Sequence, residues 1–412
     1  MNTGDLIVYI VAYFSLFTSI FFILTLIENK GTIRTKNPEK YPEVTIIVPA
    51  FNEESNIEIT LNSLINLDYP KDKLKIIVVD DGSTDNTYKI AKNFENENCR
   101  VYRKKNGGKA SALNYALKRC TSEFVGALDA DSYVKRDALR KIISYFELSP
   151  KIMAVTPSLK VHKPTNFLQK IQRIEYLIGV FLRKMFAFLG SIHVTPGPFT
   201  IYRKSFFEKY GYYDENNLTE DIEVALRIQK HNYYIENSVN AEVFTISPNK
   251  FGTLYKQRLR WYIGFFENTW KYRELFSRKY GNLGLFILPA SFFSVFLVII
   301  SLIYFSYKFI DSAIQNIINF YSIGFDFKTL IDFNFDTYLI NTNSLMFLSL
   351  LALVLGIMIV YFAKNISKEK LSIKWHYVLY IIAYWILFGF WWIAAIFYKA
   401  TGRKIKWGNK RL

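Results

Sequence analysis

Two acidic motifs and one basic, aromatic run hold the residues of this sequence best suited to chemistry. Asp129-Ala130-Asp131 places two carboxylates two positions apart, an arrangement that can bind Mg²⁺ or Mn²⁺ and so neutralise a diphosphate. Thr219-Glu220-Asp221 offers Asp221 as a base for a hydroxyl group. Gln257-Arg258-Leu259-Arg260-Trp261 combines guanidinium groups, which suit phosphate oxygens, with an indole, whose face suits a sugar ring. Together these residues indicate an enzyme that handles a charged sugar donor at a membrane surface.

Each motif also has a structural interpretation. Asp-x-Asp turns are common on protein surfaces, but here the motif follows an apolar strand, which favours a site. Thr219 could be the N-cap of a helix whose dipole Glu220 and Asp221 complement. A base is nevertheless required to deprotonate an acceptor hydroxyl, and Asp221 is the best candidate. The run Gln257–Trp261 could equally be a basic amphipathic helix resting on lipid.

The surrounding elements predict an α/β domain with a parallel sheet. Buried strands are expected at Val44–Val48, Leu74–Val79 and Glu123–Leu128, with helices from Ser55 and over Thr84–Phe94. Alternating strands and helices imply right-handed crossovers, and ligands of such sheets bind at the carboxyl ends of the strands. Three polar segments fall at those ends: Phe51-Asn52-Glu53, Asp80-Asp81-Gly82 and Asp129-Ala130-Asp131.

Two further segments suit a nucleotide. A carboxylate of Asp80-Asp81-Gly82-Ser83 could accept a hydrogen bond from the imide N–H of a uracil ring, or could close an Asx turn, or both. Asn106-Gly107-Gly108-Lys109 is a flexible loop that ends in a cation suited to phosphate oxygens.

Composition favours a soluble domain joined to membrane spans. Apolar residues make up 51% of the 412 residues and charged residues 21%, which is too apolar for a soluble protein and too polar for a helical membrane bundle. The net charge of +17 suits nucleic acid, anionic lipid or a phosphate-rich substrate. We favour the last two, because the basic residues are scattered and form no recognised nucleic-acid motif. Cys99, Cys120 and four dispersed histidines give no metal or disulfide pattern.

Apolar stretches predict membrane spans on both sides of this domain. Residues 5–27 are expected to be a retained anchor, because the start of the chain lacks the basic residues of a signal peptide. Later spans are expected at 283–307, 343–363 and 375–398. The predicted parts are an anchor over 1–30, a catalytic domain over 41–280, and a membrane region of about three spans with a basic tail over 281–412.

Two helices of the catalytic domain, at about 167–190 and 253–275, are predicted to be interfacial. For the first, which is amphipathic with a basic remainder, packing within the domain is an equally good interpretation. Residues 311–342, with Asp311, Asp326, Asp332 and Asp336, should lie outside the cell, and the lysine-rich 364–374 inside. The tail is also basic, so 375–398 is either re-entrant or leaves the tail as an exception.

Taken together, the motifs resemble the family 2 inverting glycosyltransferases of the membrane-embedded, processive type. They occur in the order and spacing of that family across about residues 43–275: Val48–Glu54, Val79–Asp85, Asn106–Asn114, Asp129–Asp131, Thr219–Asp221 and Gln257–Trp261. Within it the chain is most similar to the poly-β-1,6-N-acetylglucosamine synthases and more distantly similar to hyaluronan and cellulose synthases.

The resemblance implies a GT-A (Rossmann-like) domain inserted between transmembrane helices, a UDP-sugar donor such as UDP-GlcNAc or a related UDP-hexose, and Mg²⁺ or Mn²⁺. It assigns residues to the donor (Ala50, Glu53, Asp80 and Asp81 at the uridine, Lys109 and Asp129 at the phosphates) and to the metal (Asp129, Asp131). It assigns others to catalysis (Asp221 as base with Glu220, and Arg260 at the pyrophosphate with Gln257) and to the acceptor (Trp261, Gly197, Pro198).

The expected function is transfer of a sugar with β-linkage to a growing polysaccharide, by a multi-pass cell-membrane protein with a cytoplasmic catalytic domain. Expected partners are the UDP-sugar, a glycan or lipid-linked acceptor and membrane lipids, with room for an accessory membrane subunit. Two alternatives stay open: a non-processive transferase that adds one sugar to a lipid acceptor, and a non-catalytic membrane scaffold.

Overall fold

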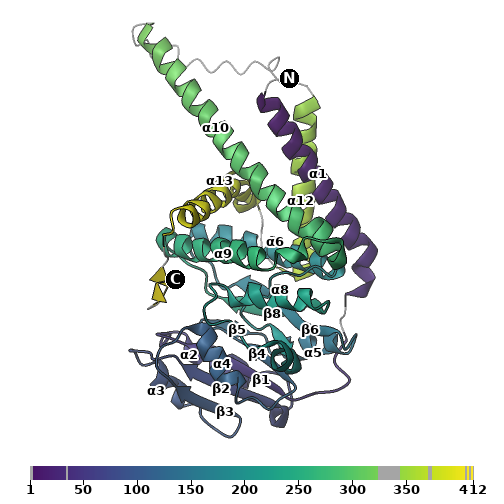
Figure 1. Ribbon diagram of the computed structural model, residues 1–412, viewed down its shortest axis with the longest axis vertical. Coiled ribbons are helices and arrows are strands. Elements are labelled where there is room, and N and C mark those ends of the chain that lie inside the picture. The colour runs from purple at the N-terminus through teal and green to yellow at the C-terminus, as the bar shows by residue number, and fades with distance from the viewer. Residues whose placement is uncertain are drawn as a thin grey trace.

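A mixed sheet forms the centre of the α/β domain (Figure 1). The computed structural model describes residues 3–33, 36–322, 344–369, 374–403, 406–407 and 410–411. The sheet has eight strands in the order β3-β2-β1-β4-β7-β6-β8-β5. The strands are β1 Val44–Ala50, β2 Leu74–Asp80, β3 Cys99–Arg103, β4 Phe124–Ala127, β5 Ser132–Val134, β6 Ile152–Val161, β7 Ile201–Arg203 and β8 Tyr234–Thr245. β1 pairs in parallel with β2 and β4, and β2 with β3, as the alternating pattern predicts.

Helices cover both faces of the sheet because its strands are apolar on both sides. Ile46 and Val48 of β1 pack in one core cluster, and the intervening Ile47 packs in the other. The helices of the domain are α2 Ile57–Ile65, α3 Thr87–Lys92, α4 Lys109–Leu117, α5 Ala138–Phe146, α7 Lys204–Tyr210 and α8 Glu220–Lys230. The α/β prediction is therefore confirmed, but the sheet is mixed rather than parallel, because β7 pairs in antiparallel fashion with β4 and β6, and β5 with β8.

The helix predicted over Thr84–Phe94 begins later, at Thr87. The residues before it are tied to the loop after β1 instead. The Thr84 amide donates to Asn52 Oδ1 (2.9 Å), and the Asn86 amide donates to Glu54 Oε2 (3.0 Å). Asp85 Oδ1 then accepts from the amide of Thr87 (3.0 Å), which starts the helix there.

Two long helices lie between the sheet and the apolar helices: α6 Phe167–Phe188 and α9 Phe251–Lys271. α6 packs against β6 and β8 and also against α1 and α12. Its Phe181 and Met185 share a core cluster with Leu26 and Val360. α6 thus makes contacts both with the sheet and with the apolar helices.

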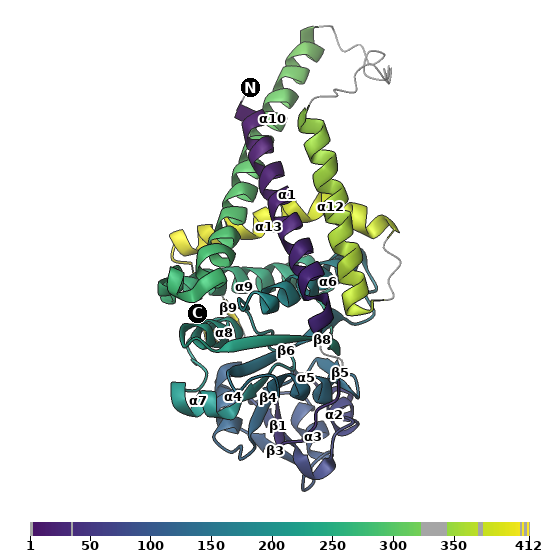
Figure 2. The ribbon, with the colours of Figure 1, turned by 90° about the vertical axis from the view of Figure 1, so that its right-hand side faces the viewer.

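The apolar helices are α1 Thr3–Asn29, α10 Leu288–Ser322, α12 Ser344–Ser367 and α13 Lys374–Ala400. Among the described residues, three helices are long and apolar enough to cross a membrane, over Thr3–Thr32, Leu283–Asn319 and Met346–Ser367. In Figures 1 and 2 these rise away from the sheet, whereas α13 runs across them above α9. α13 packs on α9, α10 and α6.

Short elements complete the described chain. They are 3₁₀ turns at Lys30–Thr32, Lys71–Lys73, Arg273–Leu275 and Arg278–Tyr280, a π-helical turn at Leu283–Ile287, and the strands β9 Lys406–Trp407 and β10 Lys410–Arg411. Asp326, Asp332 and Asp336, on which the outside location of their loop was predicted, lie outside the described residues.

Candidate active site

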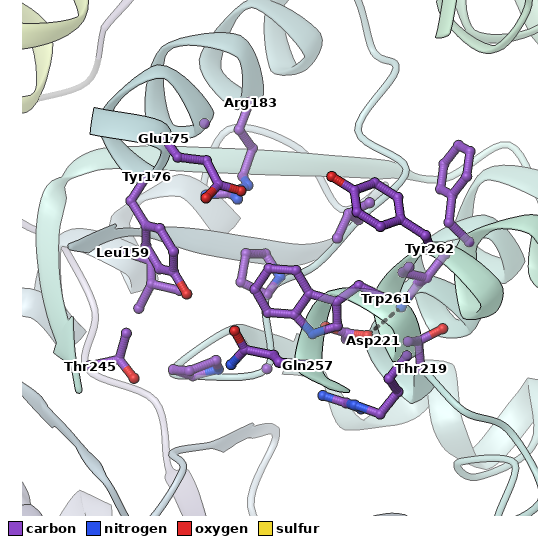
Figure 3. A pocket seen from close by; sticks show the side chains of 18 of the residues that line it. Leu159, Glu175, Tyr176, Arg183, Thr219, Asp221, Thr245, Gln257, Trp261 and Tyr262 are labelled. Atoms are coloured by element: carbon purple, nitrogen blue, oxygen red, sulfur yellow. Dashed lines mark hydrogen bonds between the residues drawn. The ribbon is translucent and has the colours of Figure 1, made fainter. Parts of the chain in front are cut away.

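A cavity of about 510 Å³ opens between the carboxyl end of the sheet and helices α6, α8 and α9 (Figure 3). Its volume is in the range of small-molecule sites. It is lined by these residues predicted from the sequence: Lys109, Asp129, Asp131, Gly197, Pro198, Glu220, Asp221, Gln257, Arg260 and Trp261. Segments far apart in the chain therefore meet at one place, where parallel sheets bind their ligands.

Lys109 links the two acidic motifs. Its Nζ lies 2.6 Å from Asp129 Oδ1 and 3.3 Å from Glu220 Oε1. Burial alone would lower the pKa of Lys109, but the charges of Asp129 and Glu220 outweigh it and raise that pKa. Lys109 therefore stays protonated and supplies a fixed positive charge at the centre of the cavity.

Asp221 has the properties of a base that works near neutral pH. Burial, followed by the charge of Glu220, raises its pKa to about 6. Asp221 Oδ1 accepts a hydrogen bond from the amide of Ile222 (2.9 Å), and its carbonyl accepts one from Thr195 Oγ1 (2.7 Å). The carboxylate is thus held in place, and most of it is ionised at pH 7.

Asp131 stands out among the acids of the cavity. Burial, then the charges of Asp129 and Glu53, raise its pKa to about 7. Its Oδ1 accepts from Ser132 Oγ (3.0 Å). Such a site favours a cation. Within the described part of the chain, no group of three or more His, Cys, Asp or Glu side chains is arranged to hold a metal by itself. Two carboxylates fit a cation whose other ligands come from a bound diphosphate.

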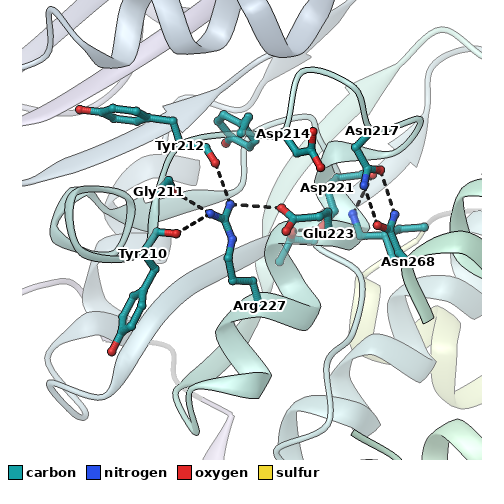
Figure 4. A network of polar contacts seen from close by, with 12 residues as sticks. Tyr210, Gly211, Tyr212, Asp214, Asn217, Asp221, Glu223, Arg227 and Asn268 are labelled. Atoms are coloured by element: carbon teal, nitrogen blue, oxygen red, sulfur yellow. Dashed lines mark hydrogen bonds and ion pairs between the residues drawn. The ribbon is translucent and has the colours of Figure 1, made fainter. Parts of the chain in front are cut away.

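A polar network holds α8, whose first turn carries Glu220 and Asp221 (Figure 4). Arg227 donates to the carbonyls of Tyr210, Gly211 and Tyr212 at 2.7–3.0 Å and lies 3.1 Å from Glu223 Oε2. The turn after α7 is thereby fixed against α8.

The predicted cap of α8 is only partly right. Thr219 occupies the N-cap position, but its side chain makes no capping hydrogen bond. Its hydroxyl oxygen instead accepts from Asn268 Nδ2 of α9 (2.9 Å). The tertiary contact replaces the local one.

Three successive turns of α9 contact the segment before α8. Arg260 donates to the carbonyl of Leu218 (2.9 Å), and Asn268 bonds Thr219 and Asn217. Between them, Gly264 lies so close to Thr219 that a Cβ atom would overlap the threonine side chain. This close approach positions Asp221 relative to the Gln257–Trp261 run.

Within that run, Arg258 has a role that the sequence did not indicate. Its side chain is fully buried and lies 2.7 Å from Glu175 Oε2 of α6. Its guanidinium carbon also lies 4.2 Å from the Trp261 ring centroid. Arg258 therefore joins α9 to α6 and orients Trp261, while Arg260 lines the cavity.

The residues predicted at the uridine do not line the cavity. Ala50 is buried, as are Asp80 at the end of β2 and Asp81 after it. Asp80 Oδ2 lies 3.1 Å from Arg103 Nε. Asp81 accepts from Lys104 Nζ (2.7 Å) and from the amide of Gly108 (2.7 Å), a residue whose φ of +90° suits glycine. Glu53 accepts from Asn56 (2.8 Å).

In this conformation, therefore, Asp81 holds the glycine loop in place.

The cavity also extends to residues that sequence reasoning missed. α6 contributes Tyr176 and Arg183, and His193 follows that helix. α10 contributes Ser291 and Ser294, and α13 contributes Phe388 and Trp392. The basic and aromatic composition of these segments is visible in the sequence, but no motif singles out these positions.

Comparison with known proteins agrees with this geometry. Residues 45–211 match the family model described as glycosyl transferase family 2. These residues form a family 2 glycosyltransferase domain. The recognition from the sequence motifs is thereby confirmed.

Curated relatives of this family 2 domain are named poly-beta-1,6-N-acetyl-D-glucosamine synthase. The one from Staphylococcus epidermidis is 34% identical over 245 residues, which is 58% of this chain and 59% of the relative. One from Staphylococcus aureus is 36% identical over 231 residues, 55% of each. The chain thus spans a little more than half the length of these curated relatives.

Among solved structures, the chain is similar to a mannosyltransferase from Pyrobaculum calidifontis in complex with GDP-Man and Mn²⁺. The TM-score is 0.60 at 20% identity, over 97% of this chain and 100% of that one. This likeness extends the shared fold from the family 2 domain to the apolar helices.

Proposed function

We propose that the protein is a membrane-integrated inverting glycosyltransferase that moves a sugar from UDP-GlcNAc or a related UDP-hexose to a growing polysaccharide with β-linkage. The observation that carries this proposal is Asp221, a positioned carboxylate with a pKa of about 6, in one cavity with Asp129, Lys109 and Arg260. The names of the curated relatives support the choice of donor sugar.

In this proposal Asp221 takes the proton of the acceptor hydroxyl as its oxygen attacks the anomeric carbon. The bond from that carbon to the diphosphate breaks on the opposite side, so single displacement converts an α-linked donor into a β-linked product. Lys109 and Arg260 donate hydrogen bonds to the departing diphosphate, whose negative charge grows in the transition state. Trp261 forms a flat surface beneath the acceptor sugar.

Asp129 and Asp131 would hold a divalent cation, Mg²⁺ or Mn²⁺. The raised pKa of Asp131 and the carboxylate pair support this assignment, as does the Mn²⁺ in the complex of the Pyrobaculum calidifontis mannosyltransferase. Such a cation neutralises charge on the diphosphate. Lys109 already balances Asp129, so the cation would chiefly compensate Asp131.

The proposed membrane arrangement has α1, α10 and α12 crossing the bilayer and α13 at its cytoplasmic surface. The catalytic domain, the lysine-rich segment after α12 and the basic tail then all lie on one side, in agreement with the positive-inside rule. A crossing at 375–398 would put the basic tail on the outer side, against that rule. In the proposed arrangement α13 does not cross, in keeping with its course across the other helices (Figure 2).

Purified full-length protein, incubated with a panel of UDP-sugars and Mg²⁺ or Mn²⁺, tests the activity through UDP release and product mass. Asp221→Asn should reduce transfer by about 10²- to 10⁴-fold and leave donor binding intact. Asp214→Asn is the matched control, because Asp214 is near α8 but pairs with Lys271 (3.0 Å) outside the cavity. A fully active Asp221→Asn variant would overturn the assignment.

A further inference from the structure

His193 is a buried histidine of the cavity that the proposed mechanism does not use. Its Nδ1 lies 3.1 Å from the carbonyl oxygen of Ser191. Because a carbonyl only accepts, Nδ1 carries the proton, and Nε2 of the neutral ring is left as an acceptor. Among the residues that the structure describes, none donates a hydrogen bond to Nε2. His193 therefore brings an unused hydrogen-bond acceptor to the cavity.

The ring of His193 is neutral at pH 7 and held in one orientation. Burial lowers the pKa of His193 below its usual value; the hydrogen bond to Ser191 opposes this effect, and the charge of Arg183 adds to it. The imidazole packs against Phe186 and Phe265, whose ring centroids lie 5.3 and 6.1 Å away. Nε2 is thus a positioned acceptor.

The wall beside His193 offers further acceptors. Phe265 lies 5.7 Å from Phe292 of α10 between ring centroids, and Ser291 and Ser294 of that helix line the cavity. Both serine hydroxyls donate to carbonyl oxygens of their own helix, at 2.7 and 2.8 Å. Their protons are therefore engaged, and each oxygen has only lone pairs left for a ligand. Such a wall matches a ligand that donates hydrogen bonds, as the hydroxyl groups of a sugar do.

The segment from His193 to Gly197 runs from this wall to the donor end of the cavity. A Cβ atom at Gly197 would lie 2.7 Å from Lys109 Nζ, the cation proposed for the donor diphosphate. Thr195, in the middle, donates to the carbonyl of Asp221 (2.7 Å). His193, at the other end, contacts aromatic rings of α6 and α9 instead. The proposed base therefore meets this segment between the donor end and His193.

This order places His193 on the acceptor side. In a single displacement the attacking hydroxyl approaches the anomeric carbon from the side opposite the diphosphate, so the acceptor sugar lies beyond the base as seen from Lys109. Asp221 takes the proton of the attacking hydroxyl. A hydrogen bond to Nε2 must then come from another hydroxyl of the same sugar.

We propose that His193 is a specificity-determining residue whose Nε2 accepts a hydrogen bond from an acceptor-sugar hydroxyl next to the attacking one. The enzyme thereby selects acceptor sugars that carry this second hydroxyl. This inference rests on the proposed glycosyltransferase function. A growing polysaccharide of uncharged sugar residues would present the same hydroxyl at every addition.

The test uses the full-length protein, the UDP-sugar that it accepts, a short N-acetylglucosamine oligomer and analogues in which one hydroxyl of the terminal residue is replaced by hydrogen. The analogue without the attacking hydroxyl cannot react. For the wild type, one reactive analogue should have a KM about 5- to 100-fold above that of the oligomer, because it leaves the buried Nε2 without a donor.

Two substitutions separate the two ring nitrogens of His193. His193→Asn keeps a donor for the Ser191 carbonyl but removes the acceptor, so it should raise the KM of the oligomer by a similar factor and no longer distinguish the analogue. His193→Gln keeps an acceptor oxygen near the position of Nε2 and should retain part of the preference. The KM of the UDP-sugar should stay within about twofold. His231→Asn is the control, because His231 stacks on Tyr210 outside the cavity.

The outcomes separate the two levels of the proposal. If the wild type releases no UDP from any donor, the glycosyltransferase function fails. If the wild type is active but treats all reactive analogues like the oligomer, or if His193→Asn still distinguishes them, the inference about His193 fails. A rise in the KM of the UDP-sugar instead of the acceptor would also overturn it. Should His193→Asn not fold, the wild-type series and His193→Gln decide by the same criteria.

Discussion

The acid limb of the pH–activity profile should belong to Asp221 and should move when Glu220 loses its charge. The wild-type pKa of Asp221 is about 6. The base is active when ionised, so activity is lost as the pH falls through that value. The ionised share is about nine tenths at pH 7 and about one tenth at pH 5, so kcat/KM should fall about tenfold between them.

Glu220→Gln is the informative perturbation. The Glu220 charge is the second cause, after burial, that raises the pKa of Asp221. The positive charge of Lys109, which lies 3.3 Å from Glu220, is then less neutralised and stabilises the ionised form of Asp221 more strongly. Both effects lower the pKa of Asp221, so the acid limb should move to lower pH even if the maximal rate declines.

The assay is UDP release at low donor concentration, because kcat/KM reports the ionisation of the free enzyme. Saturating Mn²⁺ keeps Asp131 ionised, so its own pKa of about 7 does not enter the profile. Glu208→Gln removes an acidic charge outside the cavity and should leave the limb in place. A limb that stays fixed in Glu220→Gln, or a flat profile from pH 5 to 7, would refute the reasoning.

Three further predictions concern the divalent cation, the close contact between Gly264 and Thr219, and the buried ion pair of Arg258 and Glu175. Asp131→Asn should weaken Mn²⁺ binding at least about tenfold. The affinity of the wild type for Mn²⁺ should fall as the pH drops through about 7, the pKa of Asp131. An EPR titration in which the Mn²⁺ affinity does not change with the substitution or with pH would contradict this. Gly264→Ala should lower kcat by about 100-fold because the new Cβ displaces Thr219, whereas Gly252→Ala, with open space around it, should not. Arg258→Met should lower the free energy of unfolding by about 3 kcal/mol, because it leaves Glu175 unpaired. In thermal unfolding, the double variant with Glu175→Gln should recover most of this loss. Equal stability of the single and the double variant would speak against the reasoning.

The α/β domain and the apolar helices line one cavity together. Its walls include Asp129 and Asp221 from the domain and Ser291 and Trp392 from α10 and α13. In the proposed function, a product formed at Asp221 would be bordered by α10, which crosses the proposed membrane region, and by α13. Lys160 further ties the sheet to the end of α12, because it donates to the carbonyl of Ser367 (2.6 Å).

The sequence alone determined the three parallel strands β1, β2 and β4, the acidic motifs and the domain family, but not the antiparallel strands that make the sheet mixed. β1, β2 and β4 are short apolar runs that are buried on both faces. Such runs are typical of parallel strands covered by helices, and ligands of parallel sheets bind at the carboxyl ends of the strands. The acidic motifs are local in sequence, so the sequence alone indicates Asp129, Asp131 and Asp221, and all three line one cavity.

Only the tertiary structure decided which polar groups are available. Asp81, expected at the uridine, is engaged by the loop that follows β3, and Arg258 and Arg260, two residues apart, divide between a buried ion pair and the cavity. Arg183 is one more basic residue of an amphipathic helix in the sequence, but the packing of α6 brings it into the same cavity as Asp221. Partners of these kinds come from segments far apart in the chain, so their pairing depends on how the helices pack rather than on local spacing.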